Sequence, residues 1–430
     1  MPTHHPPTTA STFALNLGAR AAAKLSLIIL PIVLLVAGGQ AQTFTVLHSF
    51  TGGADGASPF SSLAIDHYDN LYGAATFGGA HEFCTSSFGV GCGAIFKMTH
   101  RGSGWTFATL YEFGGHPFDG ANPVGTPTLA PDGTIYGTTD SGGIGGCSDL
   151  GGGCGTIFRL QPRPTICPSL SCPWTETILY SFMERGDGGN PTGAMAMDAA
   201  GILYGTTLTG NETDDVVFEA GAMGYYQVLH TFTGYPTDGS YAYAGPTIDS
   251  GGNLYGTTVQ GGSNGGGTVY QLKHSGSGWN ESVIYNFEGG ANGASPAAGL
   301  VLDPSGNLYG ITQTNPFHVI FSLTPMNGGW NFTNLYSFPG DGQNHLLYSN
   351  TLARDASGNL YGTDNNGEGS VFELSPAGGG WNYTQLYQFT GGSDGGNPGG
   401  GVVLDSVGNL YGTTTTGGAQ GHGTVWEITP

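Results

Sequence analysis

The chain has 430 residues, 80 of them glycine, and a formal net charge of −21 at pH 7. The glycines follow no Gly-X-Y period, which excludes a collagen triple helix, and the 11% of aromatic residues argue against a disordered polypeptide. Nine Lys and Arg stand against 30 Asp and Glu, so the sequence offers no basic cluster for a nucleic acid or an anionic membrane surface.

The first 41 residues predict a secretory signal peptide. Arg20 and Lys24 precede an apolar run from Leu25 to Gly38, and Ala41 ends a stretch of small residues that suits signal peptidase. We expect cleavage after Ala41, with retention as an N-terminal anchor as the alternative. The remaining chain has seven basic and 30 acidic residues, a net charge of −23, and no second apolar stretch. The sequence therefore predicts a signal peptide over 1–41, a single domain over 42–430 and no membrane span after signal removal.

A motif resembling Asn-Leu-Tyr-Gly-Thr-Thr recurs seven times in this domain. Its tyrosines are Tyr72, Tyr136, Tyr204, Tyr255, Tyr309, Tyr361 and Tyr411. A second, Leu-Tyr-x-Phe-like motif ends at Phe50, Phe113, Phe182, Phe232, Phe287, Phe338 and Phe389. A period of about fifty residues with four strand-like segments in each copy predicts a β-propeller.

The fifth copy illustrates the four expected strands of one blade. They cover 299–303, 307–312, 319–323 and 330–338, and Gly, Pro, Asn and Ser lie between them. An aspartate precedes the motif tyrosine by six residues in six copies, where we expect its carboxylate to accept backbone N–H bonds in a turn. Aromatic residues recur in the third strand, and a tryptophan begins the fourth strand in five copies. We expect these rings to pack within and between blades, with sugar stacking as the alternative.

The two ends of the domain each carry part of a blade. Thr43 to Phe50 forms a fourth strand without the three before it, and the last copy ends at Ile428 after its third strand. The N-terminal strand should therefore pair with the C-terminal blade. The expected fold is all-β, a closed ring of seven four-stranded blades without open edges. By analogy with other propellers, the first strand of each blade should lie innermost.

The loops that follow the fourth strands carry the first set of candidate ligand-binding residues. Each has an acidic or amide residue before a glycine, namely Asp55, Asp119, Asp187, Asp238, Asn292, Asp341 and Asp394. One interpretation is that Asp-Gly supplies turn geometry, and the other is that the ring of carboxylates attracts Ca²⁺ or a polyol. Calcium needs six to eight oxygens, and no copy shows a dense Asp-x-Asp-x-Asp pattern. We therefore assign no metal or cofactor and keep Ca²⁺ as the one candidate.

Six cysteines occur in three close pairs, which predict the disulfides Cys84–Cys92, Cys147–Cys154 and Cys167–Cys172. Metal ligation is the alternative, although no Cys-x-x-Cys spacing occurs. The first two pairs lie in long loops, 77–93 and 141–155, that follow the second strand of a blade. Phe83 and Phe88 lie in the first of these loops and are further candidates for ligand binding. Stapled loops over one sector of the ring suggest a lip shaped for a partner.

The sequence gives little support for catalysis. It contains no His-x-His or His-Glu-x-x-His pattern, and we assign no catalytic residue. The expected protein is a monomeric, non-enzymatic binding module for a protein or a carbohydrate at the cell exterior. A propeller-fold lyase or hydrolase that acts on polysaccharide with two carboxylates is the alternative.

The combination of Asn-Leu-Tyr-Gly-Thr-Thr, Gly-Thr-Val-Phe/Trp and Leu-Tyr-x-Phe resembles the GloVer tandem-repeat family of exported bacterial proteins. Asn253–Thr258 with Gly267–Tyr270, and Asn409–Thr414 with Gly423–Trp426, carry the resemblance most clearly. It implies export to the periplasm, cell surface or medium and no catalytic residues. Members often end in a C-terminal sorting anchor, and no such anchor precedes Pro430, so plain secretion is expected. The strand pattern is also similar to NHL-type β-propellers.

Overall fold

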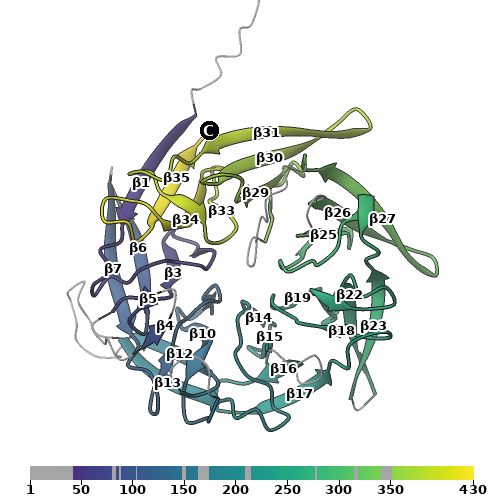
Figure 1. Ribbon diagram of the computed structural model, residues 1–430, viewed down its shortest axis with the longest axis horizontal. Coiled ribbons are helices and arrows are strands. Elements are labelled where there is room, and N and C mark those ends of the chain that lie inside the picture. The colour runs from purple at the N-terminus through teal and green to yellow at the C-terminus, as the bar shows by residue number, and fades with distance from the viewer. Residues whose placement is uncertain are drawn as a thin grey trace, which may run out of the picture. The chain divides into compact units, whose positions relative to one another are not determined.

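The computed structural model describes residues 42–79, 84–86, 89–102, 104–147, 152–162, 174–208, 215–276, 278–313, 318–339 and 351–430. These residues form the predicted ring of seven antiparallel, four-stranded blades (Figure 1). The single helical element among them is a 3-10 turn, η1 (Gly290–Asn292). None of the described helices is long and apolar enough to cross a membrane.

Six blades each take their four strands from one stretch of the chain, in order from the inner to the outer strand. Blade 1 has β2 (Ala64–Ile65), β3 (Leu71–Ala75), β6 (Ala94–Arg101) and β7 (Gly104–Glu112), and blade 2 has β9 (Thr128–Leu129), β10 (Ile135–Thr139), β12 (Thr156–Pro162) and β13 (Trp174–Ser181). Blade 3 has β14 (Ala196–Met197), β15 (Leu203–Thr206), β16 (Val216–Ala220) and β17 (Tyr226–Thr231), and blade 4 has β19 (Thr247–Ile248), β20 (Leu254–Thr258), β22 (Thr268–Ser275) and β23 (Gly278–Asn286). Blade 5 has β24 (Val301–Leu302), β25 (Leu308–Ile311), β26 (Val319–Met326) and β27 (Gly329–Ser337), and blade 6 has β28 (Ala353–Arg354), β29 (Leu360–Asp364), β30 (Ser370–Ala377) and β31 (Gly380–Gln388).

Blade 7 joins the two ends of the domain, as the sequence predicts. It contains β33 (Val403–Leu404), β34 (Leu410–Thr416), β35 (Thr424–Thr429) and, as its outer strand, β1 (Thr43–Ser49). The strand β1 runs antiparallel to β35, with Thr43 opposite Thr429 and Ser49 opposite Thr424. A further short strand, β32 (Gly396–Pro398), also pairs with β34. The closure gives blade 7 its fourth strand and joins the two ends of the domain in one sheet.

The first strands lie innermost, as Figure 1 shows for β14, β19 and β33. They are shorter than expected: blade 5 forms a strand over Val301–Leu302 rather than over 299–303. The preceding residues instead pack backbone against backbone near the ring axis. A Cβ on Gly193 would lie 2.1 Å from the backbone nitrogen of Gly245. Glycine is needed there because neighbouring blades approach too closely for any side chain.

The repeated aspartate holds the turn between the first and second strands, which confirms its predicted role. Asp303 accepts hydrogen bonds from the backbone nitrogens of Ser305 (2.8 Å) and Asn307 (2.9 Å), and from the Tyr309 hydroxyl (3.2 Å). Equivalent bonds occur at Asp66, Asp198, Asp249, Asp355 and Asp405. The motif tyrosine therefore serves the turn of its own blade.

The glycine of the motif packs under an aromatic ring of its own blade, and the threonine connects its blade to the next. A Cβ on Gly310 would lie 2.5 Å from Cζ of Phe321, so the third-strand aromatic ring covers a glycine. The Thr257 hydroxyl donates to the backbone oxygen of Ala298 in the next blade at 2.9 Å. The outer tryptophans also link blades, since Trp279 packs edge to face on Tyr204 with ring centroids 5.9 Å apart. The expectation of packing between blades is confirmed.

Two sets of loops share one side of the ring, which we call the loop face. They are the loops that follow the outer strands and the loops between the second and third strands. Short strands pair across them: β8 (Gly120–Ala121) with β11 (Ser141–Gly142), and β18 (Gly239–Ser240) with β21 (Gln260–Gly261). In blade 1, β4 (Thr85–Ser86) pairs with β5 (Gly89–Val90). These pairings place the predicted site loops together.

Candidate functional site

The aspartates that follow the outer strands are bound to their own loops. Asp119 accepts hydrogen bonds from the Tyr111 hydroxyl (2.9 Å) and from the backbone nitrogens of Gly114 (2.7 Å) and Gly120 (2.7 Å). The carboxylates of Asp55, Asp187, Asp238 and Asp394 accept similar bonds from a ring side chain and from the loop backbone. Each carboxylate thus holds its turn closed, in keeping with the turn interpretation.

Two of the seven candidate residues in the loops that follow the outer strands differ from these aspartates. Asn292 provides an amide instead of a carboxylate, and its side chain hydrogen-bonds to Tyr285. Asp341 lies outside the described residues. Binding of Ca²⁺ or a polyol by this ring of loops stays a prediction.

A second feature of the junctions between blades is a stack of rings. At each junction, one position from each of the two neighbouring blades contributes to this stack. In the first blade, it lies two residues before the phenylalanine that follows the outer strand. In the next blade, it lies six residues before the equivalent phenylalanine. At five junctions both are rings, nearly parallel, with centroids 3.8 to 4.6 Å apart. The pairs are His48–Phe107, Tyr180–Tyr226, Tyr285–Phe332, Tyr336–Tyr383 and Tyr387–Phe44.

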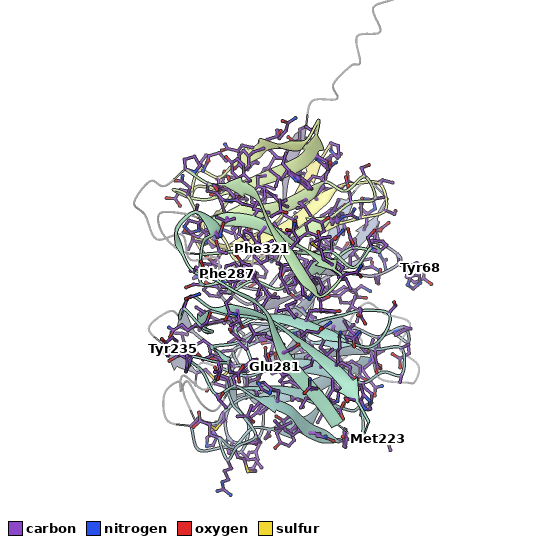
Figure 2. All side chains as sticks on the ribbon, turned by 90° about the vertical axis from the view of Figure 1, so that its right-hand side faces the viewer. Tyr68, Met223, Tyr235, Glu281, Phe287 and Phe321 are labelled. Carbon is purple, nitrogen blue, oxygen red and sulfur yellow. A yellow bond between two sulfur atoms is a disulfide. The ribbon has the colours of Figure 1, made fainter. Side chains whose placement is uncertain are left out.

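Glutamate replaces the second ring at the other two junctions. Glu176 occupies this position in blade 2 and Glu281 in blade 4, the latter labelled on the outer strands in Figure 2. Glu281 lies opposite Leu272 in its sheet, as Phe332 lies opposite Leu323 in blade 5. The register is therefore unchanged, and a carboxyl group simply stands where other junctions place an aromatic ring.

Both glutamates lie in surroundings that disfavour their charged form. Glu176 Oε1 and Glu281 Oε1 are buried and have no hydrogen-bond partner among the described residues. Burial, together with the charge of Asp119, raises the pKa of Glu176 to about 8. Burial and the charge of Asp238 raise the pKa of Glu281 to about 7, against the opposing effect of His230. Near neutral pH, each glutamate therefore favours a bound proton or a nearby cation.

The junction of blades 3 and 4 adds an imidazole to its carboxyl pair. His230 Nε2 lies 3.0 Å from Asp238 Oδ2, and one ligand atom each of His230, Asp238 and Glu281 lie within 4.8 Å of one another. The Asp238 side chain is 9% exposed and that of His230 21%. We call these three residues the His-Asp-Glu cluster. Imidazole and carboxylate groups at this spacing can hold a divalent metal ion or exchange a proton.

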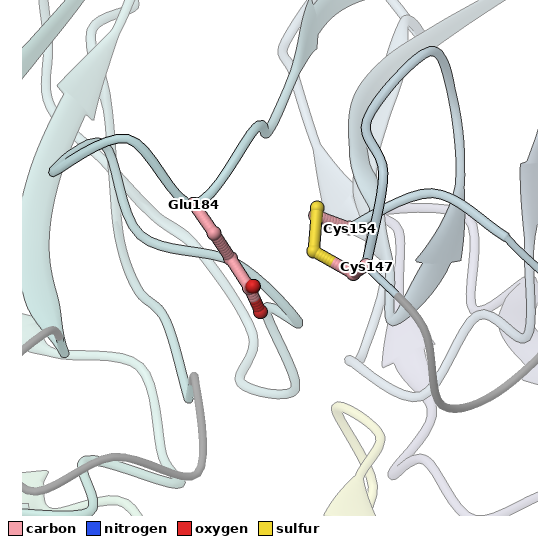
Figure 3. Close-up of side chains that lie close together, drawn as sticks. All are labelled: Cys147, Cys154 and Glu184. Carbon is pink, nitrogen blue, oxygen red and sulfur yellow. A yellow bond between two sulfur atoms is a disulfide. The ribbon is translucent and has the colours of Figure 1, made fainter.

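A second group of potential metal ligands among the described residues is excluded as a metal site because its two cysteines are oxidised. Cys147, Cys154 and Glu184 lie close together (Figure 3). The two sulfurs form a disulfide and are not available as thiolate ligands.

The predicted disulfides Cys84–Cys92 and Cys147–Cys154 are both present. The third predicted pair, Cys167 and Cys172, and the candidate residues Phe83 and Phe88 lie outside the described residues. The loop 114–120 lies between the two stapled loops. A Cβ on Gly115 would lie 2.8 Å from Cys84 Sγ, and His116 Nδ1 lies 2.8 Å from the backbone oxygen of Gly143. The disulfides thus support a continuous group of loops.

Large apolar side chains are exposed on these supported loops. Phe118 is 85% exposed, Ile144 60%, Val90 55% and Met183 37%. We call the surface formed by these four residues the stapled-loop surface. The other exposed large apolar residues are Tyr235, in the loop between blades 3 and 4, and five residues in turns of blades 1, 3, 5 and 7 on the opposite side of the ring: Tyr68, Met223, Tyr225, Met326 and Val407.

The ring centre contains a small cavity of about 50 Å³. Backbone and small side chains line it, including Gly125, Gly193, Gly245 and Thr351. The described lining residues include no carboxylate, imidazole or thiol. Among its described lining residues, the cavity therefore holds no acid–base pair for hydrolysis or elimination.

The sequence contained a signal for the His-Asp-Glu cluster that the motif analysis missed. When the repeats are aligned, the position six residues before the outer-strand phenylalanine reads Phe, Phe, Glu, Tyr, Glu, Phe and Tyr, from Phe44 to Tyr383. Two glutamates in an otherwise aromatic column mark the exceptions. Which residues face them became clear only in the folded ring.

Comparisons with known proteins agree with this architecture. The profile of the Gloeobacter/Verrucomicrobia repeat matches residues 147–368. No curated protein sequence matches the chain. A proposed 6-phosphogluconolactonase from Bacteroides uniformis is 13% identical, with a TM-score of 0.50, and the match covers 74% of this chain and 84% of that one.

Two further solved structures are similar. A protein from Lactobacillus plantarum is 17% identical over 74% of this chain and 87% of its own, with a TM-score of 0.49. A proposed oxidoreductase (glucose dehydrogenase) from Thermus thermophilus is 14% identical over 90% of this chain and 100% of its own, with a TM-score of 0.46. At these identities the likeness concerns the fold alone.

Proposed function

The chain belongs to the Gloeobacter/Verrucomicrobia repeat family, and we propose that it is an exported, monomeric β-propeller that binds a partner protein through its stapled-loop surface. The exposed apolar side chains of Val90, Phe118, Ile144 and Met183 on neighbouring loops carry this proposal. Contiguous apolar patches with polar surroundings mark interaction sites on soluble proteins.

Export is supported by two independent features. The apolar, basic-flanked segment before Ala41 has the composition of a signal peptide, which leaves residues 42–430 as the mature domain. Two disulfides close short loops, and such bonds persist in oxidising compartments. The proposed location is therefore the periplasm, the cell surface or the medium.

The support beneath the exposed side chains favours recognition over chance exposure. The loop that carries Phe118 contacts the first disulfide through Gly115 and the second stapled loop through His116. A surface that is already ordered loses less conformational entropy when it binds. Phe118 is the expected anchor because an exposed aromatic ring offers a large area for burial at low entropic cost.

The charge of the mature domain points to a partner with basic or neutral surface. A net charge of −23 would repel an acidic protein and accelerate the approach of a basic one. Binding should therefore slow as salt rises, since ions screen the attraction over a Debye length of about 8 Å at physiological ionic strength.

The test is to identify and then reconstitute the complex. Residues 42–430, produced with their disulfides, would be crosslinked to the exported proteins of the source bacterium, and the captured partner would be purified separately. Its Kd would be measured for the wild type, Phe118→Ser and Ile144→Ser. We expect each substitution to weaken binding at least tenfold, because burying an apolar side chain contributes about 1.5–3 kcal/mol.

Met223→Ser and Val407→Ser provide matched controls, since both residues are exposed on the opposite side of the ring. Equal losses in these variants, or unchanged affinity in Phe118→Ser, would contradict the proposed surface. A parallel glycan array tests the carbohydrate alternative, and binding there that depends on Phe118 would replace the protein partner. Release of reducing sugar from any bound glycan would replace a binding module with an enzyme.

A further inference from the structure

We propose that His230, Asp238 and Glu281 bind one divalent transition metal ion of the Zn²⁺ type at the junction of blades 3 and 4. The proposal is independent of the stapled-loop surface and concerns the outer wall of the ring. It rests on the chemistry of the three side chains, their mutual distances and a comparison among the junctions of the same chain.

The donor set suits a transition metal better than calcium. An imidazole nitrogen and two carboxylate oxygens are ordinary Zn²⁺ ligands, whereas Ca²⁺ takes only oxygens and needs more of them. Two ligands of a tetrahedral Zn²⁺ ion lie about 3.3 Å apart when each bond is about 2.0 Å. His230 Nε2 and Asp238 Oδ2 are 3.0 Å apart, and all three ligand atoms lie within 4.8 Å. His230 would bind through Nε2 with its proton on Nδ1, giving up its hydrogen bond to Asp238 Oδ2. A small movement of Glu281 would then complete three bonds and leave a fourth position for water.

The cluster is held in place by its surroundings. The backbone nitrogen of Thr233 donates to Asp238 Oδ2 at 2.8 Å, and that of Gly239 donates to Oδ1 at 2.7 Å. The His230 ring packs edge to face on buried Phe232, with centroids 5.0 Å apart. These contacts orient two ligands before a metal arrives. The partial exposure of His230 leaves a route for the ion.

Glu281 is the ligand that distinguishes this junction from the other His–Asp junction of the ring. Its buried Oε1 has no hydrogen-bond partner among the described residues. A buried carboxyl oxygen without a partner is costly, and a bound cation would remove that cost. Within the described parts of the chain, two groups of three side chains lie close enough to bind one metal ion. They are the His-Asp-Glu cluster and the group that contains the oxidised Cys147 and Cys154.

Two other junctions act as internal controls. The junction of blades 7 and 1 has the same His–Asp contact, His48 to Asp55 at 3.1 Å, but places Phe107 where blade 4 has Glu281. The Phe107 ring stacks on His48 at 3.8 Å. The junction of blades 1 and 2 has the acid pair Asp119 and Glu176 without an imidazole. We infer that neither binds the metal, since each lacks one kind of ligand.

The experiment is a metal titration of residues 42–430 after removal of metals with a chelator. Isothermal titration with ZnCl₂ at pH 7.5 should give one equivalent bound per chain. Glu281→Gln and His230→Ala should each weaken binding at least tenfold. His48→Ala and Glu176→Gln remove the equivalent groups at other junctions and should keep the wild-type Kd within about twofold.

Glu281→Phe guards against a loss that comes from misfolding. It copies Phe107 beside a histidine, so it should fold, bind no Zn²⁺ and melt at or above the temperature of the metal-free wild type. Absence of one-to-one binding tighter than about 10 µM would overturn the proposal. Wild-type affinity in Glu281→Gln, loss of binding in His48→Ala, or binding of Ca²⁺ but not Zn²⁺ would overturn it as well.

Discussion

Replacing Glu176 by phenylalanine should stabilise the ring. The substitution rebuilds a junction that the chain already contains elsewhere. At the junction of blades 6 and 7, Tyr387 stacks on Phe44 with ring centroids 3.8 Å apart, and Asp394 accepts the Tyr387 hydroxyl at 3.0 Å. The junction of blades 1 and 2 has the same tyrosine and aspartate but presents Glu176 to them.

Two effects set the size of the gain. A stacked aromatic pair contributes about 0.5–1.5 kcal/mol beyond its buried area. Removing a buried carboxyl oxygen that has no partner contributes about 1–3 kcal/mol, and we take the lower end because Glu176 is only partly buried. The free energy of unfolding should therefore rise by about 1.5–2.5 kcal/mol at alkaline pH.

The gain should depend on pH with a defined sign. The pKa of Glu176 is about 8 in the folded protein, above its ordinary value of 4.5, so the folded state binds this proton more tightly than the unfolded state. The stability from that proton is fully present below pH 4.5 and is lost as the pH rises towards 8. Phenylalanine has no such proton, so the advantage of the variant should be larger at pH 9 than at pH 5.

Urea denaturation followed by tryptophan fluorescence at pH 5 and pH 9 measures both effects. The reciprocal variant Phe44→Glu is the control and should lose stability, more so at pH 9. A lower free energy of unfolding for Glu176→Phe at pH 9, or an equal gain at both pH values, would refute the reasoning.

Three further predictions concern the scaffold. Removing the first disulfide by Cys84→Ser with Cys92→Ser should lower the free energy of unfolding by about 2.5 kcal/mol for its eight-residue separation, and urea curves identical to those of the wild type would contradict this. Gly310→Ala should cost about 1–3 kcal/mol because its Cβ would lie 2.5 Å from Phe321, and thermal melts should show partial rescue by adding Phe321→Leu. The third prediction concerns Asp303. Burial acts to raise its pKa, but the hydrogen bonds that its carboxylate accepts, those from Asn307 first, have the larger combined effect and lower the pKa below 3.8. The stability it contributes is present above that value and is lost as the pH falls through the folded pKa, so circular dichroism against pH should show a weaker acid transition in Asp303→Asn.

Much of the architecture was predictable because the repeat encodes it locally. The tyrosine and phenylalanine positions predicted seven blades, and the fragments at Thr43–Phe50 and Ile428 predicted the closure that β1 and β35 make. The turn role of the repeated aspartates followed from short-range spacing, because donor and acceptor lie within six residues. The disulfides Cys84–Cys92 and Cys147–Cys154 followed from proximity in the chain in the same way.

The candidate sites were harder to predict because their members come from different blades. Residue spacing was enough for the blade count, the turns and the local disulfides, since each depends on residues close together in the chain. The folded ring was needed to show that Glu281 faces His230 and Asp238, and that the loop bearing Phe118 lies between two disulfides. Such contacts depend on how one blade lies against the next, which no spacing within a repeat specifies. The same closure that makes the seven copies alike as a scaffold brings their few exceptional residues into contact.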